Sequence, residues 1–382
     1  MDASIVQPFH PEVVAVPGSS SLGYVLEPAI VISLLATGVW LNRRNTSRSP
    51  PLFPYPASPS SPASARDTSR YANNWISRTL HRLPFILEVL YWALTYWIYQ
   101  IARAISAVLF IDEGTVDLAR RHGIQVVEAE RAMSIQWENG VQEWVMHTPW
   151  LLNSLNRIYS FIHIPATIAF LAYFYRTQRF NTYAPARRTL ALANLLAFVV
   201  FTLWPCMPPR LLPKSYGFID TVHRGAVSSV WTTNKFCNQY AAMPSLHFGY
   251  SLIVGWSLFA NAPAGTRSRW RRMGLHYLFM GYPALILLAI VATANHYLLD
   301  AAAGFVVAVL ALQANAVLLR LLPLENYVFD KLHIHKPPPA GRAEAVGAEE
   351  GLPRFAYEAV DDGGAKEKRR SCGSFVFTTA EA

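Results

Sequence analysis

The chain has 382 residues, of which 52% are hydrophobic and only 15% are charged, well below the roughly 25% charge of a soluble domain. Three cysteines exclude a disulfide-built scaffold, and 11 Trp, 18 Tyr and 20 Phe exclude a largely disordered chain. The net charge of +9 lies in loops between apolar blocks, which indicates a membrane protein with no role in nucleic-acid binding.

Seven apolar blocks follow one another along the chain, and each approaches the roughly 20 residues that a helix needs to cross a hydrocarbon core about 30 Å thick. They are residues 25–41, 83–110, 158–175, 189–207, 243–263, 277–294 and 301–319. The first is the weakest, because it is short and contains Glu27. A soluble protein with buried helices is the alternative, but so many apolar stretches of this length are rare in soluble folds. We expect an all-α, multi-pass transmembrane helical bundle with six core helices and one N-terminal span.

The basic residues of the loops predict how these spans are oriented. If all seven blocks cross, three loops share the side of the C-terminal tail: residues 42–82, 176–188 and 261–272. Together they hold 15 Arg against one acid, Asp67, and basic loops stay in the cytosol. Segments 111–156 and 208–242 then lie outside the cell or in a lumen. We expect an endomembrane protein of the ER or Golgi with a cytosolic C-terminal tail.

The same pattern divides the chain into five segments. They are an outer N-terminal segment without the basic start of a cleaved signal peptide (1–24), a possible first span (25–41), a flexible Pro- and Ser-rich cytosolic linker (42–82), a membrane domain (83–322) and a disordered cytosolic tail (323–382). Within the membrane domain, apolar residues at helical spacing predict one amphipathic helix on the outer side: Val126, Ala129, Met133, Trp137, Val141 and Trp144.

Three polar groups lie at the ends of apolar blocks, all on the predicted outer side. Residues 205–210 read Pro-Cys-Met-Pro-Pro-Arg, residues 242–247 read Ala-Met-Pro-Ser-Leu-His, and residues 295–300 read Asn-His-Tyr-Leu-Leu-Asp. The topology rests on the charges of the loops and was fixed without these groups. Their common side therefore favours one shared site.

His296 and Asp300 are four residues apart, which places them on one face of a helix. A carboxylate there can accept the Nδ1–H of the imidazole, which fixes the tautomer and leaves Nε2 free to attack or to take a proton. The alternative is a polar pair that only terminates two spans. Arg210 either offers a permanently charged fork for phosphate or snorkels at the membrane edge.

Pro244 and Ser245 suit the first turn of a helix, where free backbone N–H groups bind anions. His247 would project into the same place, unless it is an interfacial histidine without a role. His163 lies in an otherwise apolar block, as a hydrogen-bonded intramembrane residue or as part of a site. A nucleophilic His, an orienting Asp, a second His as general acid, an Arg and a helix N-terminus together suit phosphoryl transfer. We expect neither a metal nor a cofactor.

The order Pro-Pro-Arg, Pro-Ser-Leu-His and His-Tyr-Leu-Leu-Asp resembles the type 2 phosphatidic acid phosphatase (PAP2) superfamily, over about residues 83–322. Within it, the chain looks most like the inositolphosphotransferase-type branch, which includes inositol phosphorylceramide synthases. The most specific stretches are residues 240–247 and 295–304. This resemblance implies a six-helix membrane core that acts at the lumenal or outer face.

The resemblance also implies a role for each polar residue. His296 would form a phosphohistidine intermediate, and Asp300 would orient it. His247 would protonate the leaving group and then activate the acceptor. The phosphate would be held by the side chain of Arg210 and by the backbone of Ser245 and Leu246. His163 is a further substrate-binding candidate.

The chain departs from the phosphatase branches of this superfamily at three points. The fourth block has no Lys, Leu246 replaces a Gly, and residues 288–290 carry no Arg. The synthase-like branch shares the last two departures, which therefore favour it. With one evident Arg for the phosphate, a second cation would come from the outer loop, where three candidates lie: Lys214, Arg224 and Lys235.

These features predict a lipid phosphotransferase whose partners are the bilayer, a membrane lipid donor and a hydroxyl acceptor. A lipid phosphatase that uses water as acceptor is the alternative, and a non-catalytic membrane protein that keeps the fold is the second alternative. Cys206 and Cys237 both lie toward the outer side, either as a disulfide or as two unrelated thiols.

Overall fold

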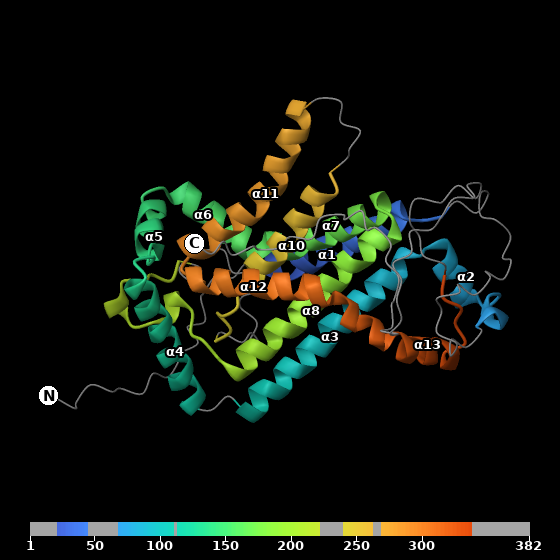
Figure 1. The fold of residues 1–382 in the computed structure, drawn as a ribbon, viewed down its shortest axis with the longest axis horizontal. Helices are drawn as coiled ribbons and strands as arrows, with labels where there is room; N and C mark the ends of the chain where they lie inside the picture. The colour runs from blue at the N-terminus through green and yellow to red at the C-terminus, as the bar shows by residue number, and fades with distance from the viewer. Residues whose placement is uncertain (1–20, 45–67, 111–112, 222–239, 263–268, 338–382) are drawn as a thin grey trace, which may run out of the picture. The chain divides into compact units, whose positions relative to one another are not determined.

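The computed structural model describes residues 21–44, 68–110, 113–221, 240–262 and 269–337 (Figure 1). Throughout these residues the chain is helical and contains no strand, which confirms the expected all-α bundle. Each of the seven apolar blocks coincides largely with helix. The long elements are α1 (Ser21–Leu41), α3 (Phe85–Phe110), α7 (His163–Thr177), α8 (Phe180–Leu203), α10 (Leu246–Ala260), α11 (Arg269–Ala292) and α12 (Leu298–Ala314).

Within the described residues, five helical stretches are long and apolar enough to cross a membrane, which makes the chain an integral membrane protein. They are Phe85–Ala102, Pro149–Thr177, Phe180–Leu203, Met273–Ala292 and Leu298–Lys331. The other two predicted spans correspond to shorter apolar helices, Leu26–Leu41 and Leu246–Ala260.

Helix α10 lies at the centre of the bundle, where it packs against α11, α12, α8 and α7. Its contact with α12 is unusually close, because two glycines meet there. A Cβ atom built on Gly304 would overlap the carbonyl oxygen of Ser245, and one on Gly249 would lie 3.1 Å from the carbonyl oxygen of Gly304. Small residues permit this approach of two backbones.

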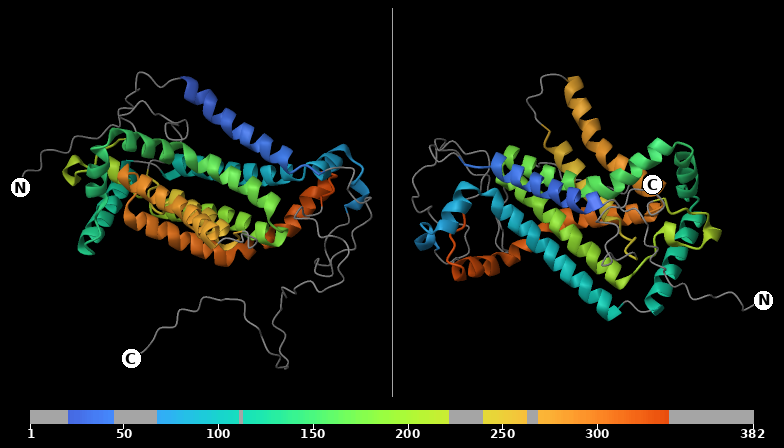
Figure 2. Two further views of the ribbon diagram at one scale, coloured as in Figure 1. Left: turned by 90° about the horizontal axis from the view of Figure 1, so that it is seen from above. Right: turned by 180° about the vertical axis from the view of Figure 1, so that it is seen from behind.

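The single amphipathic helix predicted before the third block is wrong. The structure has α4 (Glu113–Ala132) and α5 (Glu138–Met146), separated by a turn in which Ser134 adopts a φ of 57°. Left-handed backbone ends a helix, and the spacing of apolar residues does not reveal it. Trp137 and Trp144, on the predicted apolar face, are 64% and 62% exposed. The short helices α4, α5 and α6 (Pro149–Arg157) gather beside the N-terminal end of α12 (Figures 1 and 2).

The far end of α12 leads through η6 (Asn315–Leu321) into α13 (Leu322–Lys331), which lies beside α2 (Trp75–Arg82). Two contacts join them: Asn74 Nδ2 donates to the His333 carbonyl at 2.8 Å, and Arg70 pairs with Asp330 at 2.9 Å. The predictions that all of 42–82 is a flexible linker and all of 323–382 is disordered are therefore wrong for residues 68–82 and 323–337. The Pro- and Ser-rich stretch and most of the tail lie outside the described residues.

Candidate functional site

The three polar groups predicted to meet are held together by backbone hydrogen bonds. The amide of Ala242 donates to the Cys206 carbonyl oxygen at 3.1 Å, and the amide of Ser245 donates to that of Asp300 at 2.9 Å. The amide of Arg210 donates to the carbonyl oxygen of Ala294, just before the third group, at 2.9 Å. Residues almost 100 positions apart in the chain thus form one compact junction at the N-terminal ends of α10 and α12.

Three imidazole rings and one phenol ring meet at this junction, and we call them the imidazole cluster: Tyr159, His163, His247 and His296. The ring centroids of His247 and His296 are 5.7 Å apart, and those of His163 and His247 are 4.9 Å apart. Tyr159 lies over His247 at 4.5 Å with an angle of 29° between the ring planes. The structure therefore brings together the three histidines named from the sequence.

His296 is held in one tautomer by its surroundings. Its Nδ1 lies 2.8 Å from the carbonyl oxygen of Ala242 and 3.4 Å from Asp300 Oδ2. A carbonyl oxygen only accepts, so Nδ1 carries the proton and Nε2 keeps its lone pair. The carboxylate predicted to orient this ring is present, but the carbonyl of Ala242 is the nearer acceptor. His296 is 5% exposed and Asp300 is fully buried.

Asp300 also organises the start of its own helix. Its Oδ2 accepts from the backbone N–H of Tyr297 at 3.0 Å, as in a capping box. Asp300 therefore faces the His296 ring with its side chain, caps α12, and accepts from the Ser245 amide with its carbonyl oxygen.

Two buried glutamates that the sequence did not single out complete the cap of α12. Glu138 Oε1 accepts from Leu298 N at 2.9 Å, and Glu130 Oε1 accepts from Leu299 N at 2.8 Å. Both side chains are fully buried. Burial and the neighbouring Glu138 carboxyl raise the pKa of Glu130 to about 9, so Glu130 is protonated at neutral pH. In the sequence, both acids belong to the polar side of a helical pattern.

The first turn of α10 presents the amides of Leu246 and His247, whereas the predicted phosphate site used the backbone of Ser245 and Leu246. The Ser245 hydroxyl accepts from Phe248 N at 3.4 Å, and the Ser245 N–H is used by Asp300. First-turn amides have no acceptor within their helix. Among the described residues, the amides of Leu246 and His247 donate to no other group, so they point an unused pair of N–H groups out of the helix start.

Arg210 approaches the junction from a short 3-10 turn, η4 (Pro209–Leu211). Its side chain is 11% exposed and its Nη1 lies 3.8 Å from Asp220 Oδ2. Its backbone is fixed against Ala294, two residues before His296. Of the candidates for a second cation, Lys214 is exposed in η5 (Lys214–Tyr216), and the other two lie outside the described residues.

Tyr159 is a site residue that no sequence motif indicates. It lies in a π-helical turn, η3 (Ile158–Ile162), which joins α6 to α7 immediately before His163. Such turns shift the helical register by one residue and recur at functional sites. The only sequence signal is the spacing of four between Tyr159 and His163.

Two further features of this region are the cysteines and the arrangement of metal-ligating side chains. Cys206 is a buried free thiol, and Cys237 lies outside the described residues, so the disulfide stays a prediction. Within the described ranges, no group of three His, Cys, Asp or Glu side chains has an arrangement that could hold a metal ion.

One comparison with known proteins identifies related sequences. A family model described as the PAP2 superfamily matches residues 124–314, which is half of the chain. This range includes α5, the imidazole cluster, Arg210 and the whole of α12. No curated protein and no solved structure matches the chain significantly.

Proposed function

Because the chain belongs to the PAP2 superfamily, we propose that it transfers a phosphoryl or phosphoinositol group from a membrane lipid to a hydroxyl acceptor, as inositol phosphorylceramide synthases do. The observation that carries this proposal is the geometry of His296. Its Nδ1 faces the Ala242 carbonyl oxygen and Asp300, which leaves Nε2 for attack. The centroid of its ring lies 5.7 Å from the centroid of the His247 ring. A buried nucleophile beside a second imidazole suits two-step transfer.

In the first step, the lone pair of His296 Nε2 attacks phosphorus and the bond to the leaving oxygen breaks. His247 donates a proton to that oxygen, and the phosphoryl group stays on His296 as a phosphohistidine. Asp300 faces the Nδ1–H and stabilises the positive charge that the ring gains. Arg210 and the amides of Leu246 and His247 are the groups available to neutralise the phosphate oxygens.

In the second step, His247 takes the proton of the acceptor hydroxyl, and the acceptor oxygen attacks phosphorus. The bond to Nε2 breaks and His296 regains its starting form. His163 lies against His247 and Tyr250, where we assign it to binding of substrate or acceptor. Positively charged loops support a lumenal position for the site in the ER or Golgi and a cytosolic tail.

Hydrolysis is the second candidate, since water could replace the hydroxyl acceptor at the same residues. Two features favour transfer. Leu246 stands where the phosphatase branches have a Gly, and His296 is 5% exposed, which limits access of bulk water to the intermediate.

The test uses the purified full chain in detergent with two substrate mixtures. Phosphatidylinositol with ceramide should give inositol phosphorylceramide and diacylglycerol, whereas release of free phosphate from phosphatidic acid would support hydrolysis. His296→Ala should abolish either reaction. His147→Ala removes an exposed histidine of the same predicted side and should leave the rate unchanged. Product formation by His296→Ala at the wild-type rate would exclude the mechanism.

A further inference from the structure

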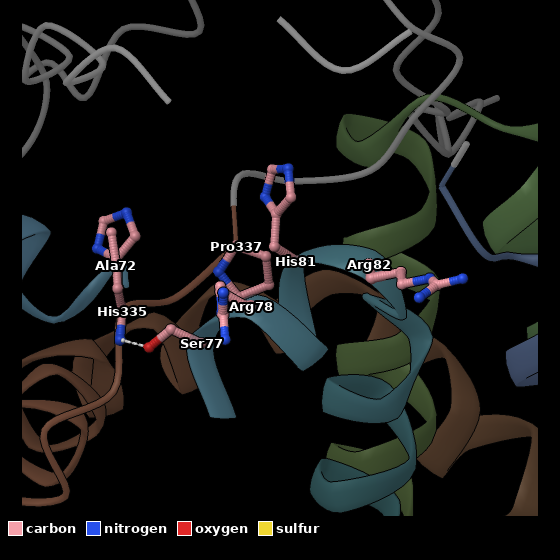
Figure 3. Close-up of a pocket in the computed structure, with 7 residues that line it drawn as sticks. All are labelled: Ala72, Ser77, Arg78, His81, Arg82, His335 and Pro337. Atoms are coloured by element: carbon pink, nitrogen blue, oxygen red, sulfur yellow. Dashed lines mark hydrogen bonds between the residues drawn. The ribbon is translucent and has the colours of Figure 1, made fainter. Parts of the chain in front are cut away.

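A pocket whose lining includes two arginines and two histidines lies at the other end of the bundle from the imidazole cluster. It has a volume of about 370 Å³ and is formed by α2 and the segment that follows α13 (Figure 3). Its lining residues are Ala72, Ser77, Arg78, His81, Arg82, His335 and Pro337. The backbone N–H of His335 donates to Ser77 Oγ at 2.9 Å, which fixes the returning chain against α2 (Figure 3).

The pocket concentrates positive charge without a compensating acid. Two arginines and two histidines line it, and no carboxylate does so among the described residues. Neighbouring cations are neutralised, since Arg70 pairs with Asp330 and Lys336 pairs with Glu325. Neither Arg78 nor Arg82 forms an ion pair with a described carboxylate.

A third arginine, Arg44, lies beside His81 after the end of α1. Arg44 Nη1 lies 3.4 Å from His81 Nδ1, and Arg44 N donates to the Arg82 carbonyl oxygen at 2.9 Å. Burial, Arg44 and His335 together lower the pKa of His81. An anion bound here would offset the repulsion that Arg44 and His335 exert on a protonated His81.

The position of the pocket indicates which kind of anion could reach it. Residues 42–82 are predicted to be cytosolic, and Trp75 at the start of α2 is 72% exposed, as suits a side chain at a membrane interface. Anionic phospholipids gather in the cytosolic leaflet, and basic pockets between helix ends bind their headgroups. Arginine presents a planar fork that matches phosphate oxygens.

We propose that this pocket binds a phosphate group at a site separate from the imidazole cluster, presented by an anionic lipid headgroup or by a soluble phosphate compound. Arg78 contacts the phosphate oxygens, and His81 and His335 add hydrogen-bond donors. The exposed side chain of Arg82 extends away from these residues in Figure 3 and turns toward the anion when it binds. The site does not depend on the reaction proposed for His296, because the two lie at opposite ends of the long helices.

The test measures binding to the full chain carrying His296→Ala, which prevents turnover of the probe. Native mass spectrometry in detergent follows retention of phosphatidic acid, with phosphatidylcholine as the reference lipid. A parallel arm follows the shift in Tm on addition of inorganic phosphate. Both arms are repeated with the pair Arg78→Gln and Arg82→Gln, and with Arg179→Gln as a control that removes one exposed charge from another predicted cytosolic loop.

The pair of substitutions should weaken binding about tenfold or more, which is the loss expected for charge-assisted hydrogen bonds. Loss of phosphatidic acid retention alone identifies a lipid headgroup, and loss of the phosphate-induced Tm shift identifies a soluble anion. Arg179→Gln should retain both responses. Because Arg78 and Arg82 are exposed, the unliganded Tm of the pair should equal that of the parent protein. If the pair responds to both probes as strongly as Arg179→Gln does, the proposal is overturned.

Discussion

The phenol ring of Tyr159 stacks on the imidazole of His247, with centroids 4.5 Å apart. This contact holds the ring of the proposed general acid over the reaction centre, so Tyr159 is a positioning residue. Tyr159→Ala should lower kcat about 10- to 100-fold, because misplacement of a reacting group by about 1 Å costs this much. Tyr159→Phe keeps the stacking surface and should stay within a few-fold of wild type. Equal losses in both variants would show that the hydroxyl, and not the stacking, matters.

Arg210 is the cation that the fold brings to the junction, since its amide is bonded to Ala294. Arg210→Ala should lower kcat/KM about 10²- to 10³-fold, the usual loss when one donor to a developing anion is removed. Lys214→Ala is the matched control, because Lys214 follows in the same loop and is exposed. A loss in the Lys214 variant as large as that in the Arg210 variant would reveal a second phosphate ligand.

Glu130 supports the helix that carries Asp300. Glu130→Ala leaves the N–H of Leu299 without its acceptor in a buried place and should cost about 1–3 kcal/mol, measured as a lower Tm in detergent. Glu130→Gln keeps an acceptor oxygen and resembles the protonated acid, so its Tm should stay close to that of wild type. Glu143→Gln, an exposed acid of α5, serves as the control.

The raised pKa of Glu130 predicts a pH dependence of stability. The folded state favours the protonated acid, so its contribution is complete below the ordinary value of 4.5 and declines as the pH rises toward about 9. The Tm of wild type should fall as the pH rises from 4.5 to about 9, and the Tm of Glu130→Gln should fall less. Parallel Tm profiles for the two proteins would contradict the assignment.

The contact between α10 and α12 depends on Gly304. Gly304→Ala places a methyl group on the Ser245 carbonyl oxygen and should separate the two helices, at a cost of about 1–3 kcal/mol and with reduced activity. Gly281→Ala is a control in α11, where an added Cβ meets nothing within 4 Å. The Tm of the Gly281→Ala variant should be unchanged or slightly higher, because Ala favours helix over Gly. Thermal unfolding of both variants in the same detergent makes the comparison.

The sequence predicts well those features that depend on local composition. Apolar blocks of the length of a bilayer gave the helical bundle, and three short polar groups gave the residues that meet at the ends of α10 and α12. His296 and Asp300 also lie close together, but not on one helical face as their spacing of four predicted, because His296 precedes the N-cap of α12. The chemistry of such pairs is visible because the partners are close in the sequence.

Features that depend on distant contacts were not predictable in this way. Glu130 and Glu138 cap a helix whose first residues follow about 160 positions later, and nothing local distinguishes them from solvated acids. Tyr159 reaches the site because a π-turn shifts its register. Residues 323–337 are held in place by contacts of Asp330 and His333 with Arg70 and Asn74, which come 260 and 259 positions earlier in the chain.

The carbonyl oxygen of Asp300 accepts the amide of Ser245, while its carboxylate faces His296. The proposed nucleophile and the helix start that would bind the phosphate are therefore connected through one residue, Asp300. Thickness changes of the surrounding bilayer would leave their spacing intact.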